Sequence, residues 1–270
     1  MNNDLIVVTD LDGTLLDHTT YQFEAARPAL NYLDRFHIPL ILSSSKTAAE
    51  IRDICKQLNN HHPFIIENGA GIVIPEADDS YKKITLGVER ELILNILNKL
   101  RTELGFSYTG FADMRVEEVV ALTGLSKEQA RKARKRDFTE PLLWQGDDMQ
   151  WRQFCTELER RGLSVTRGGR FIHISGSTDK GKALQWLKNY FAEQRGCPIR
   201  VLALGDSEND KAMLEHADYS VIIRSHFHAL PEIKARNLLI SEEYGPEGWN
   251  NCVIQLLNKL GFITRGKTNG

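Results

Sequence analysis

Long hydrophobic runs are absent from this sequence of 270 residues. The longest apolar stretches, such as residues 5–8 and 201–204, are only a few residues long, whereas a helix that spans a membrane needs roughly 20 apolar residues. The first residues also lack the basic and apolar segments of a secretory signal. We therefore expect a cytoplasmic protein with no membrane partner.

Cysteine is scarce, and neither sign of charge dominates. The four cysteines lie far apart and form no CxxC pair, which excludes the common zinc clusters and a thioredoxin-like redox pair. Lysine and arginine number 34 against 36 aspartates and glutamates, so the formal net charge is −2. A basic run at residues 131–136 has acidic neighbours, and we interpret it as a solvated helix face. We expect no nucleic-acid partner and no obligate protein partner.

The first and last thirds of the sequence alternate between strand and helix signals. Short apolar runs at residues 5–8, 39–42 and 200–204 are each followed by a segment with helical signals. Such runs are typical of parallel strands that are buried on both faces. The pattern predicts an α/β fold with a Rossmann-like, doubly wound parallel sheet.

The middle of the sequence has a different charge balance. Residues 83–170 contain 16 basic and 13 acidic side chains, whereas the rest contains 18 basic and 23 acidic ones. Helical periodicity at residues 88–104 and a capping box that starts at Ser126 indicate a second α/β module. We therefore predict a core made of residues 1–82 and 172–270, with a smaller α/β domain inserted at residues 83–171.

The strongest chemical signal directly follows the first predicted strand. Asp10, Asp12 and Gly13 belong to the sequence DLDGT, and ligands of open parallel sheets bind at the carboxyl ends of the strands. Two carboxylates at this spacing can divide the roles of nucleophile and general acid/base. A turn or a helix cap is the alternative interpretation, because Asp and Gly are common in both.

A second acidic motif follows another buried strand of the prediction. The sequence GDSEND contains Asp206 and Asp210 directly after residues 201–204. Hard carboxylate oxygens suit Mg²⁺, which usually takes one or two carboxylates together with a substrate phosphate. The alternative is a helix cap formed by Asp206 or Ser207.

The two motifs together resemble the first and fourth motifs of the haloacid dehalogenase-like phosphatase superfamily. Ser44 matches the second motif of that superfamily and Lys180 the third, and all four occur in the expected order. The resemblance implies that Asp10 is a nucleophile that forms an aspartyl-phosphate and that Asp12 is the general acid/base. It further implies that Ser44 and Lys180 hold the transferring phosphoryl group.

The same resemblance implies a Mg²⁺ ion. Its ligands would be the Asp10 carboxylate, the Asp12 backbone carbonyl and Asp206, supported by Asn209 and Asp210. A divalent cation and a lysine would offset the repulsion between these carboxylates and a phosphate dianion.

Two of these assignments have close alternatives in the sequence. Ser43, Ser44 and Ser45 are consecutive, and each can supply the phosphate-binding hydroxyl. Lys182 lies two positions after Lys180 and is the alternative cation.

The predicted insert resembles the larger α/β caps of the Cof-like branch of the superfamily. Residues 42–47, 67–70, 124–126, 170–173 and 245–249 further resemble the family of mannosyl-3-phosphoglycerate phosphatases. That resemblance implies hydrolysis of mannosyl-3-phosphoglycerate to phosphate and mannosylglycerate, a compatible solute. The expected partner is thus a small phosphorylated sugar-glycerate substrate.

Such a substrate carries a phosphate, a carboxylate and sugar hydroxyls. Arg170 is our candidate for an anion contact, because arginine can bind a carboxylate through two hydrogen bonds. His173 belongs to the same predicted strand, at residues 170–174. Lys46, Glu67 and Asn68 are further candidates. Each of three candidates also has an interpretation without a substrate contact. Arg170 can be a surface residue of a strand, and His173 a histidine that is hydrogen-bonded within the fold. Asn68 can be a turn former.

Three other functions are alternatives. The chain resembles phosphatases of other sugar phosphates, such as glucosyl-3-phosphoglycerate, and phosphomannomutase-like phosphotransferases, which would use the same Asp10 and Asp12. A non-enzymatic phosphosugar sensor is the third. The complete set of Asp10, Asp12, Lys180 and Asp206 argues against the sensor.

Overall fold

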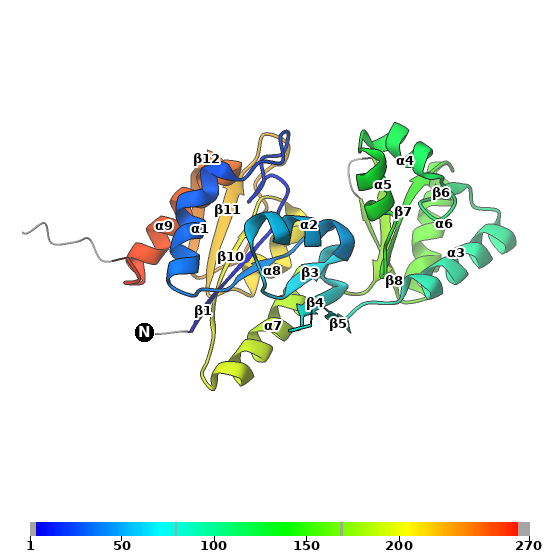
Figure 1. Ribbon diagram of the computed structural model, residues 1–270. Coiled ribbons are helices and arrows are strands. Elements are labelled where there is room, and N and C mark those ends of the chain that lie inside the picture. Colours follow the sequence, from blue (N-terminus) through cyan, green and yellow to red (C-terminus); the bar gives the residue numbers. More distant parts are fainter. Residues whose placement is uncertain (1–3, 79, 168–169, 264–270) are drawn as a thin grey trace, which may run out of the picture. The chain divides into compact units, whose positions relative to one another are not determined.

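The computed structural model describes residues 4–78, 80–167 and 170–263 (Figure 1). The chain divides into two compact units, the first made of Met1–Ser43 and Lys180–Gly270 and the second of Ser44–Asp179. The second unit thus contains the predicted insert together with residues 44–82 and 172–179, which the sequence pattern assigned to the core.

The first unit is built on a five-stranded sheet in which every neighbouring pair is parallel. Its strands, in the order in which they lie side by side, are β12 (Leu238–Tyr244), β11 (Tyr219–Arg224), β10 (Arg200–Gly205), β1 (Leu5–Thr9) and β2 (Leu40–Leu42). The predicted parallel sheet of an α/β fold is therefore confirmed.

Helices cover both faces of this sheet (Figure 1). They are α1 (Arg27–Arg35), preceded by the 3₁₀ turn η1 (Glu24–Ala26), α7 (Lys180–Arg195), the turn η3 (Glu208–Asp210), α8 (Lys211–Glu215) and α9 (Gly245–Lys259). α1 and α9 pack together, α9 contacts β11 and β12, and α8 packs on β10 and against α7. Since β1 is completely buried and β10 nearly so, their apolar runs lie between two helical layers.

The order of the strands reverses between β1 and β10. The chain passes from β1 to β2 on one side, and from β10 to β11 on the other, while β1 and β10 pair directly with Thr9 opposite Leu204. Ligands of open α/β sheets bind at such a reversal, beyond the carboxyl ends of the strands. Both acidic motifs follow these two strands.

The second unit begins with α2 (Ala48–Leu58) and a three-stranded antiparallel sheet. The sheet contains β3 (Phe64–Ile66), β4 (Gly71–Pro75) and β5 (Tyr81–Thr85), with the turn η2 (Glu67–Gly69) between β3 and β4. β3 and β4 pair as an antiparallel hairpin, and Thr47 and Glu50 form a capping box at the start of α2.

A four-stranded antiparallel sheet forms the rest of the second unit. Its strands lie in the order β6 (Tyr108–Gly110), β7 (Thr139–Trp144), β9 (Ile172–Gly176) and β8 (Leu163–Arg167). The helices are α3 (Arg90–Leu104), α4 (Val116–Thr123), α5 (Lys127–Ala133) and α6 (Asp148–Glu159). Leu142 of β7 packs in a cluster with α3 and α6, whereas Leu143, on the opposite face, contacts the cluster of α4 and α5.

The sequence pattern did not indicate the strands β5, β8 and β12. β12 and β5 are largely exposed; YKKIT lacks an apolar run, and the run in LLISEEY is limited to its first three residues. β8 is an edge strand of its sheet. The expected boundary at residue 171 falls just before β9, whose partners are β7 and β8. Among the described residues, no helix combines the length and the apolar character needed to cross a membrane.

Candidate active site

Asp10 lies where β1 leaves the sheet. Its main-chain N–H donates to the carbonyl oxygen of Leu204 at 2.9 Å, which continues the pairing of β1 with β10 by one residue. The residue is only 6% exposed. The carboxylate is therefore held beyond a completely buried strand, at the edge where the sequence pattern expected the site.

Lys180 is the first residue of α7, and its side chain is fully buried. Its Nζ donates to Oδ1 of Asp10 and to Oδ1 of Asp210, each at 2.6 Å. Lys182, the alternative cation, is exposed. The geometry favours Lys180 as the cation of this site.

Asp210 connects Lys180 to the second acidic motif. While its Oδ1 accepts from Lys180, its Oδ2 accepts from the main-chain N–H groups of Asp206 and Ser207 at 3.1 Å each. One ligand atom each from Asp10, Asp206 and Asp210 lies within 4.8 Å of the other two. The two motifs, which follow the paired strands β1 and β10, therefore converge on one buried cluster.

Three carboxylates in this cluster share one lysine. Burial raises the pKa of Asp10 well above its usual range, Lys180 opposes the shift, and the neighbouring carboxylates of Asp210 and Asp206 add to it. Burial also raises the pKa of Asp206, and Asp210 contributes. Burial alone would lower the pKa of Lys180, but Asp10 and Asp210 outweigh it and raise that pKa. The excess of negative charge favours an additional cation.

Asp206 offers an oxygen atom that is suited to such a cation. The Oδ2 atom of Asp206 is buried, and within the described part of the chain it has no hydrogen-bond partner. A Cβ atom on Gly13, which has φ of +79°, would lie 2.7 Å from that oxygen. Only glycine at position 13 avoids a steric clash with this oxygen. Carboxylate donors around an unpartnered buried oxygen fit a hard divalent ion such as Mg²⁺.

Asp12 lies in a tight turn that follows Asp10. Leu16 N donates to Leu11 O at 2.8 Å, and Gly13 N donates to Leu16 O at 2.9 Å. Asp12 is partly buried, and its charge contributes to the raised pKa of Asp10. The turn thus holds a second carboxylate in electrostatic contact with the first.

In the second unit, main-chain hydrogen bonds bring four other predicted residues together. Asn68 N donates to Ser44 O at 2.9 Å, and Glu67 N donates to Lys46 O at 3.0 Å. The buried Ser44 Oγ accepts from Lys46 N at 3.2 Å. Glu67 and Asn68 both have left-handed φ values, of 50° and 58°. The segment after β2 and the turn after β3 therefore form one substructure.

The carboxylate of Glu67 is already occupied by protein donors. It accepts from Asp137 N at 2.8 Å, Phe138 N at 3.2 Å and Thr139 Oγ1 at 2.5 Å. Nη1 of Arg136 lies 3.8 Å from Oε2, and the Glu67 side chain is completely buried. These contacts anchor the segment before β7 and account for Glu67 without a substrate contact.

Arg136 is a residue that sequence reasoning missed, because the whole run 131–136 was interpreted as a solvated helix face. That interpretation is wrong here: α5 ends at Ala133, and the side chain of Arg136 is only 7% exposed. Nη1 of Arg136 donates to Thr139 Oγ1 at 2.7 Å and to the carbonyl oxygen of Ser45 at 3.3 Å. Burial, with a contribution from the Arg136 charge, lowers the pKa of His173 to about 3, so that imidazole is neutral.

The remaining candidates occupy less distinctive places. Asn209 is exposed, and its Oδ1 accepts from Ser207 Oγ at 2.7 Å. Arg170 lies in an exposed bend just before β9. Ser43 Oγ is buried and, in the described residues, lacks a hydrogen-bond partner, so Ser43 remains an alternative to Ser44.

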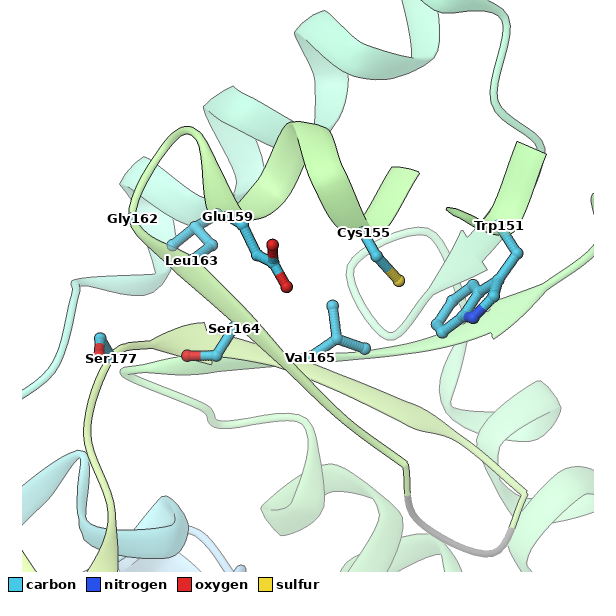
Figure 2. A pocket seen from close by; sticks show the side chains of 8 residues that line it. All are labelled: Trp151, Cys155, Glu159, Gly162, Leu163, Ser164, Val165 and Ser177. Carbon is cyan, nitrogen blue, oxygen red and sulfur yellow. The ribbon is translucent and has the colours of Figure 1, made fainter. Parts of the chain in front are cut away.

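A pocket of about 490 Å³ lies in the second unit between α6 and β8 (Figure 2). It is lined by Trp151, Cys155, Glu159, Gly162, Leu163, Ser164, Val165 and Ser177. None of the predicted site residues belongs to this lining, so the pocket and the candidate site are different features.

Residues 7–243 match the haloacid dehalogenase-like hydrolase family. A relative from Methanococcoides burtonii is 38% identical over 94% of this chain and 97% of its own length, and one from Persephonella marina is 35% identical over 95% and 98%. Both are named glucosyl-3-phosphoglycerate/mannosyl-3-phosphoglycerate phosphatase.

Solved structures agree on the fold. A protein from Thermoplasma acidophilum aligns with a TM-score of 0.65 at 17% identity, covering 96% of this chain and 98% of its own. A phosphatase of the haloalkanoate enzyme superfamily from Bacteroides thetaiotaomicron aligns with the same TM-score at 18% identity, covering 97% of each chain.

The chain belongs to the haloacid dehalogenase-like hydrolase family. The family match confirms the resemblance seen in the sequence. The family and the names of the two relatives also confirm the predicted enzyme class, a phosphoric monoester hydrolase. The roles of individual residues stay predictions.

Proposed function

We propose that this chain is a Mg²⁺-dependent phosphatase that hydrolyses mannosyl-3-phosphoglycerate to mannosylglycerate and phosphate. The observation that carries the proposal is the buried cluster in which Lys180 contacts both Asp10 and Asp210 at 2.6 Å beside the unpartnered Oδ2 of Asp206. A cluster of carboxylates can bind a dianionic phosphate only when cations balance the negative charge of both.

Asp10 is the nucleophile of the proposed reaction. Lys180 holds Oδ1 of the carboxylate and thereby orients the group. An oxygen of Asp10 attacks the phosphorus, the bond from phosphorus to the leaving-group oxygen breaks, and an aspartyl-phosphate forms. Lys180 also offers its positive charge to the phosphoryl oxygens, which lowers the cost of bringing two anions together.

Asp12 is the general acid and base. It gives a proton to the oxygen of the leaving sugar-glycerate and then takes a proton from the water that attacks the aspartyl-phosphate. That second step releases inorganic phosphate and returns both carboxylates to their starting state. The turn at residues 11–16 holds Asp12 in place for both transfers.

Asp10, Asp206 and the backbone carbonyl of Asp12 would hold Mg²⁺, with Asp210 supporting Lys180 and Asn209 nearby. When bound, the ion supplies positive charge to the phosphoryl group. Asp210 fixes the loop that carries Asp206 through two main-chain N–H groups. Within this proposal, Ser44 supplies the hydroxyl that binds a phosphoryl oxygen.

The substrate is proposed from the names of the two relatives and from the segments that resemble their family. In this proposal the four-stranded sheet and its helices form the substrate-specific cap. His173 lies on the face of β9 that also carries Pro141 of β7 in register. Together with Arg170 and Lys46, this neutral histidine is a candidate for contacts to the sugar and the carboxylate.

A substrate panel tests this function. Phosphate release with Mg²⁺ is measured for mannosyl-3-phosphoglycerate, glucosyl-3-phosphoglycerate, 3-phosphoglycerate, mannose 1-phosphate and flavin mononucleotide, with Asp10→Asn as the control. We expect the mannosyl compound to have the highest kcat/KM and the variant to be inactive. Equal or better turnover of the glucosyl compound, which the relatives' names include, would replace the sugar but keep the enzyme class. Isomerisation of mannose 1-phosphate without phosphate release would instead indicate a phosphotransferase.

A further inference from the structure

A chain of hydrogen bonds runs from α9 to the main chain of Asp10. The indole Nε1 of Trp249 donates to Oγ1 of Thr9 at 2.9 Å, and the same hydroxyl donates to the carbonyl oxygen of Asp10 at 2.8 Å. Trp249 and Thr9 are completely buried. The three residues are therefore linked by two consecutive hydrogen bonds that are shielded from water.

The acceptor at the end of this chain lies outside the regular pairing of the sheet. The carbonyl oxygen of Thr9 accepts from Ser43 N at 2.8 Å, and Asp10 N donates to Leu204 O. The next carbonyl, that of Asp10, receives the Thr9 hydroxyl instead of a strand partner. Buried carbonyls need such a donor. The hydroxyl thus sets the direction of the peptide that joins Asp10 to the turn of Asp12.

The start of α9 lies next to the same turn. Gly245, the first residue of α9, has φ of +50°, and a Cβ there would lie 3.9 Å from the carbonyl oxygen of Gly13. A Cβ on Gly248 would lie 2.2 Å from Glu243 O, so glycine is required. The two glycines at the start of α9 therefore allow the close packing that brings Trp249 against the end of β1.

We propose that Trp249 is a positioning residue for the nucleophile, acting through the hydroxyl of Thr9 on the main chain of Asp10. This inference rests on the proposed role of Asp10. The indole uses its single donor to fix the Thr9 hydroxyl as a donor toward Asp10, because a hydroxyl that accepts from Trp249 has its own proton available. The orientation of the Asp10 main chain is thereby fixed, and with it the direction in which the Asp10 carboxylate points.

The test compares four variants of the full chain. Thr9→Val and Trp249→Phe each break the chain of hydrogen bonds, the double variant breaks both links, and Thr9→Ser keeps the hydroxyl. Ser220→Ala is the matched control, because it removes another buried hydroxyl of the same sheet, one that donates to Leu214 O. Steady-state kinetics are measured with p-nitrophenyl phosphate and with mannosyl-3-phosphoglycerate, and folding is checked by thermal unfolding.

We expect Thr9→Val to lower kcat about 10-fold with KM changed less than about twofold, because a small displacement of a reacting group costs rate rather than binding. Trp249→Phe should have a smaller effect of the same kind. The double variant should be no slower than Thr9→Val, since both substitutions break one serial connection. Thr9→Ser should retain most of the activity, and Ser220→Ala should change thermal stability but not kcat.

Two results overturn the inference. One is a folded Thr9→Val or Trp249→Phe variant with the kcat of the wild type. The other is a pair of effects that multiply in the double variant. If Thr9→Val does not fold, Trp249→Phe alone decides. Because p-nitrophenyl phosphate carries no sugar, the inference survives an error in the proposed substrate. Inactivity of the wild type on every phosphate ester would instead contradict the proposed function itself.

Discussion

Nζ of Lys180 lies 2.6 Å from Oδ1 of Asp10, and neither side chain is more than slightly exposed. The same Nζ contacts Asp210, which in turn fixes the loop of Asp206. One ammonium group thus joins two acidic motifs that are almost 200 residues apart in the sequence. Removing it leaves buried carboxylates without their positive partner, which costs more than the loss of an exposed ion pair.

Lys180→Met should lower kcat by at least about 100-fold, because it removes the charge that offsets the repulsion between Asp10 and a phosphate dianion. The matched control is Lys182→Met, since Lys182 is exposed on the same helix. We expect the control to keep kcat within about twofold of the wild type. Phosphate release with p-nitrophenyl phosphate measures both; equal losses in the two variants would contradict the assignment.

Gly13→Ala should raise the Mg²⁺ concentration required for half-maximal activity by about fivefold or more. The new methyl group would lie 2.7 Å from Oδ2 of Asp206. Gly124→Ala is the control, because φ of +77° imposes similar backbone strain while nothing lies within 4 Å of the new carbon. Both variants should lose about 1–2 kcal/mol of stability. Measuring activity against Mg²⁺ concentration distinguishes the two variants. The Mg²⁺ concentration required for half-maximal activity should change only for Gly13→Ala.

His173→Asn should make the protein less sensitive to acid. The pKa of His173 is about 3 in the folded chain against about 6.5 in an unfolded one. Between these values the unfolded chain binds a proton that the folded chain does not, so stability falls as the pH decreases from 6.5 toward 3, by at most about 1.4 kcal/mol per pH unit. Thermal unfolding at pH 7 and pH 5 should show a smaller decrease in Tm for this variant than for the wild type or for His61→Asn, which changes an exposed histidine.

Glu67→Gln should destabilise the second unit by about 2–4 kcal/mol, because an amide group would face the three donors that the carboxylate now accepts. Glu128→Gln is the control, since Glu128 pairs with Lys132 at an exposed position. Denaturant unfolding measures the free energy of unfolding of both variants. In Glu67→Gln, the rate of hydrogen exchange should increase most at the main-chain amides of Asp137 and Phe138. Equal stability of the two variants would show that the buried contacts contribute little.

The parts of the fold that the sequence predicts well are those with a local signal. The apolar runs of β1 and β10 and the capping box at Thr47 each specify a strand or a helix start within a few residues. Because both acidic motifs follow predicted parallel strands, the sequence also places them at the same edge of the sheet. That β1 and β10 are neighbours is known only from the structure.

The parts that escaped prediction depend on distant residues. β12 has no apolar alternation because it is a largely exposed edge strand, and only its pairing with β11 defines it. Arg136 is buried because Glu67, from another part of the chain, lies 3.8 Å away. Trp249 is separated from Thr9 by 240 positions, and nothing near either residue indicates their hydrogen bond.

The most direct test of the central claim is to identify the residue that becomes phosphorylated. The enzyme is mixed with Mg²⁺ and mannosyl-3-phosphoglycerate, quenched in acid during turnover and reduced with borohydride, which converts an aspartyl-phosphate to homoserine. Mass spectrometry of the peptides should then find homoserine at position 10, and none in the Asp10→Asn variant. Turnover by that variant, or a phosphoryl group on another residue, would contradict the account.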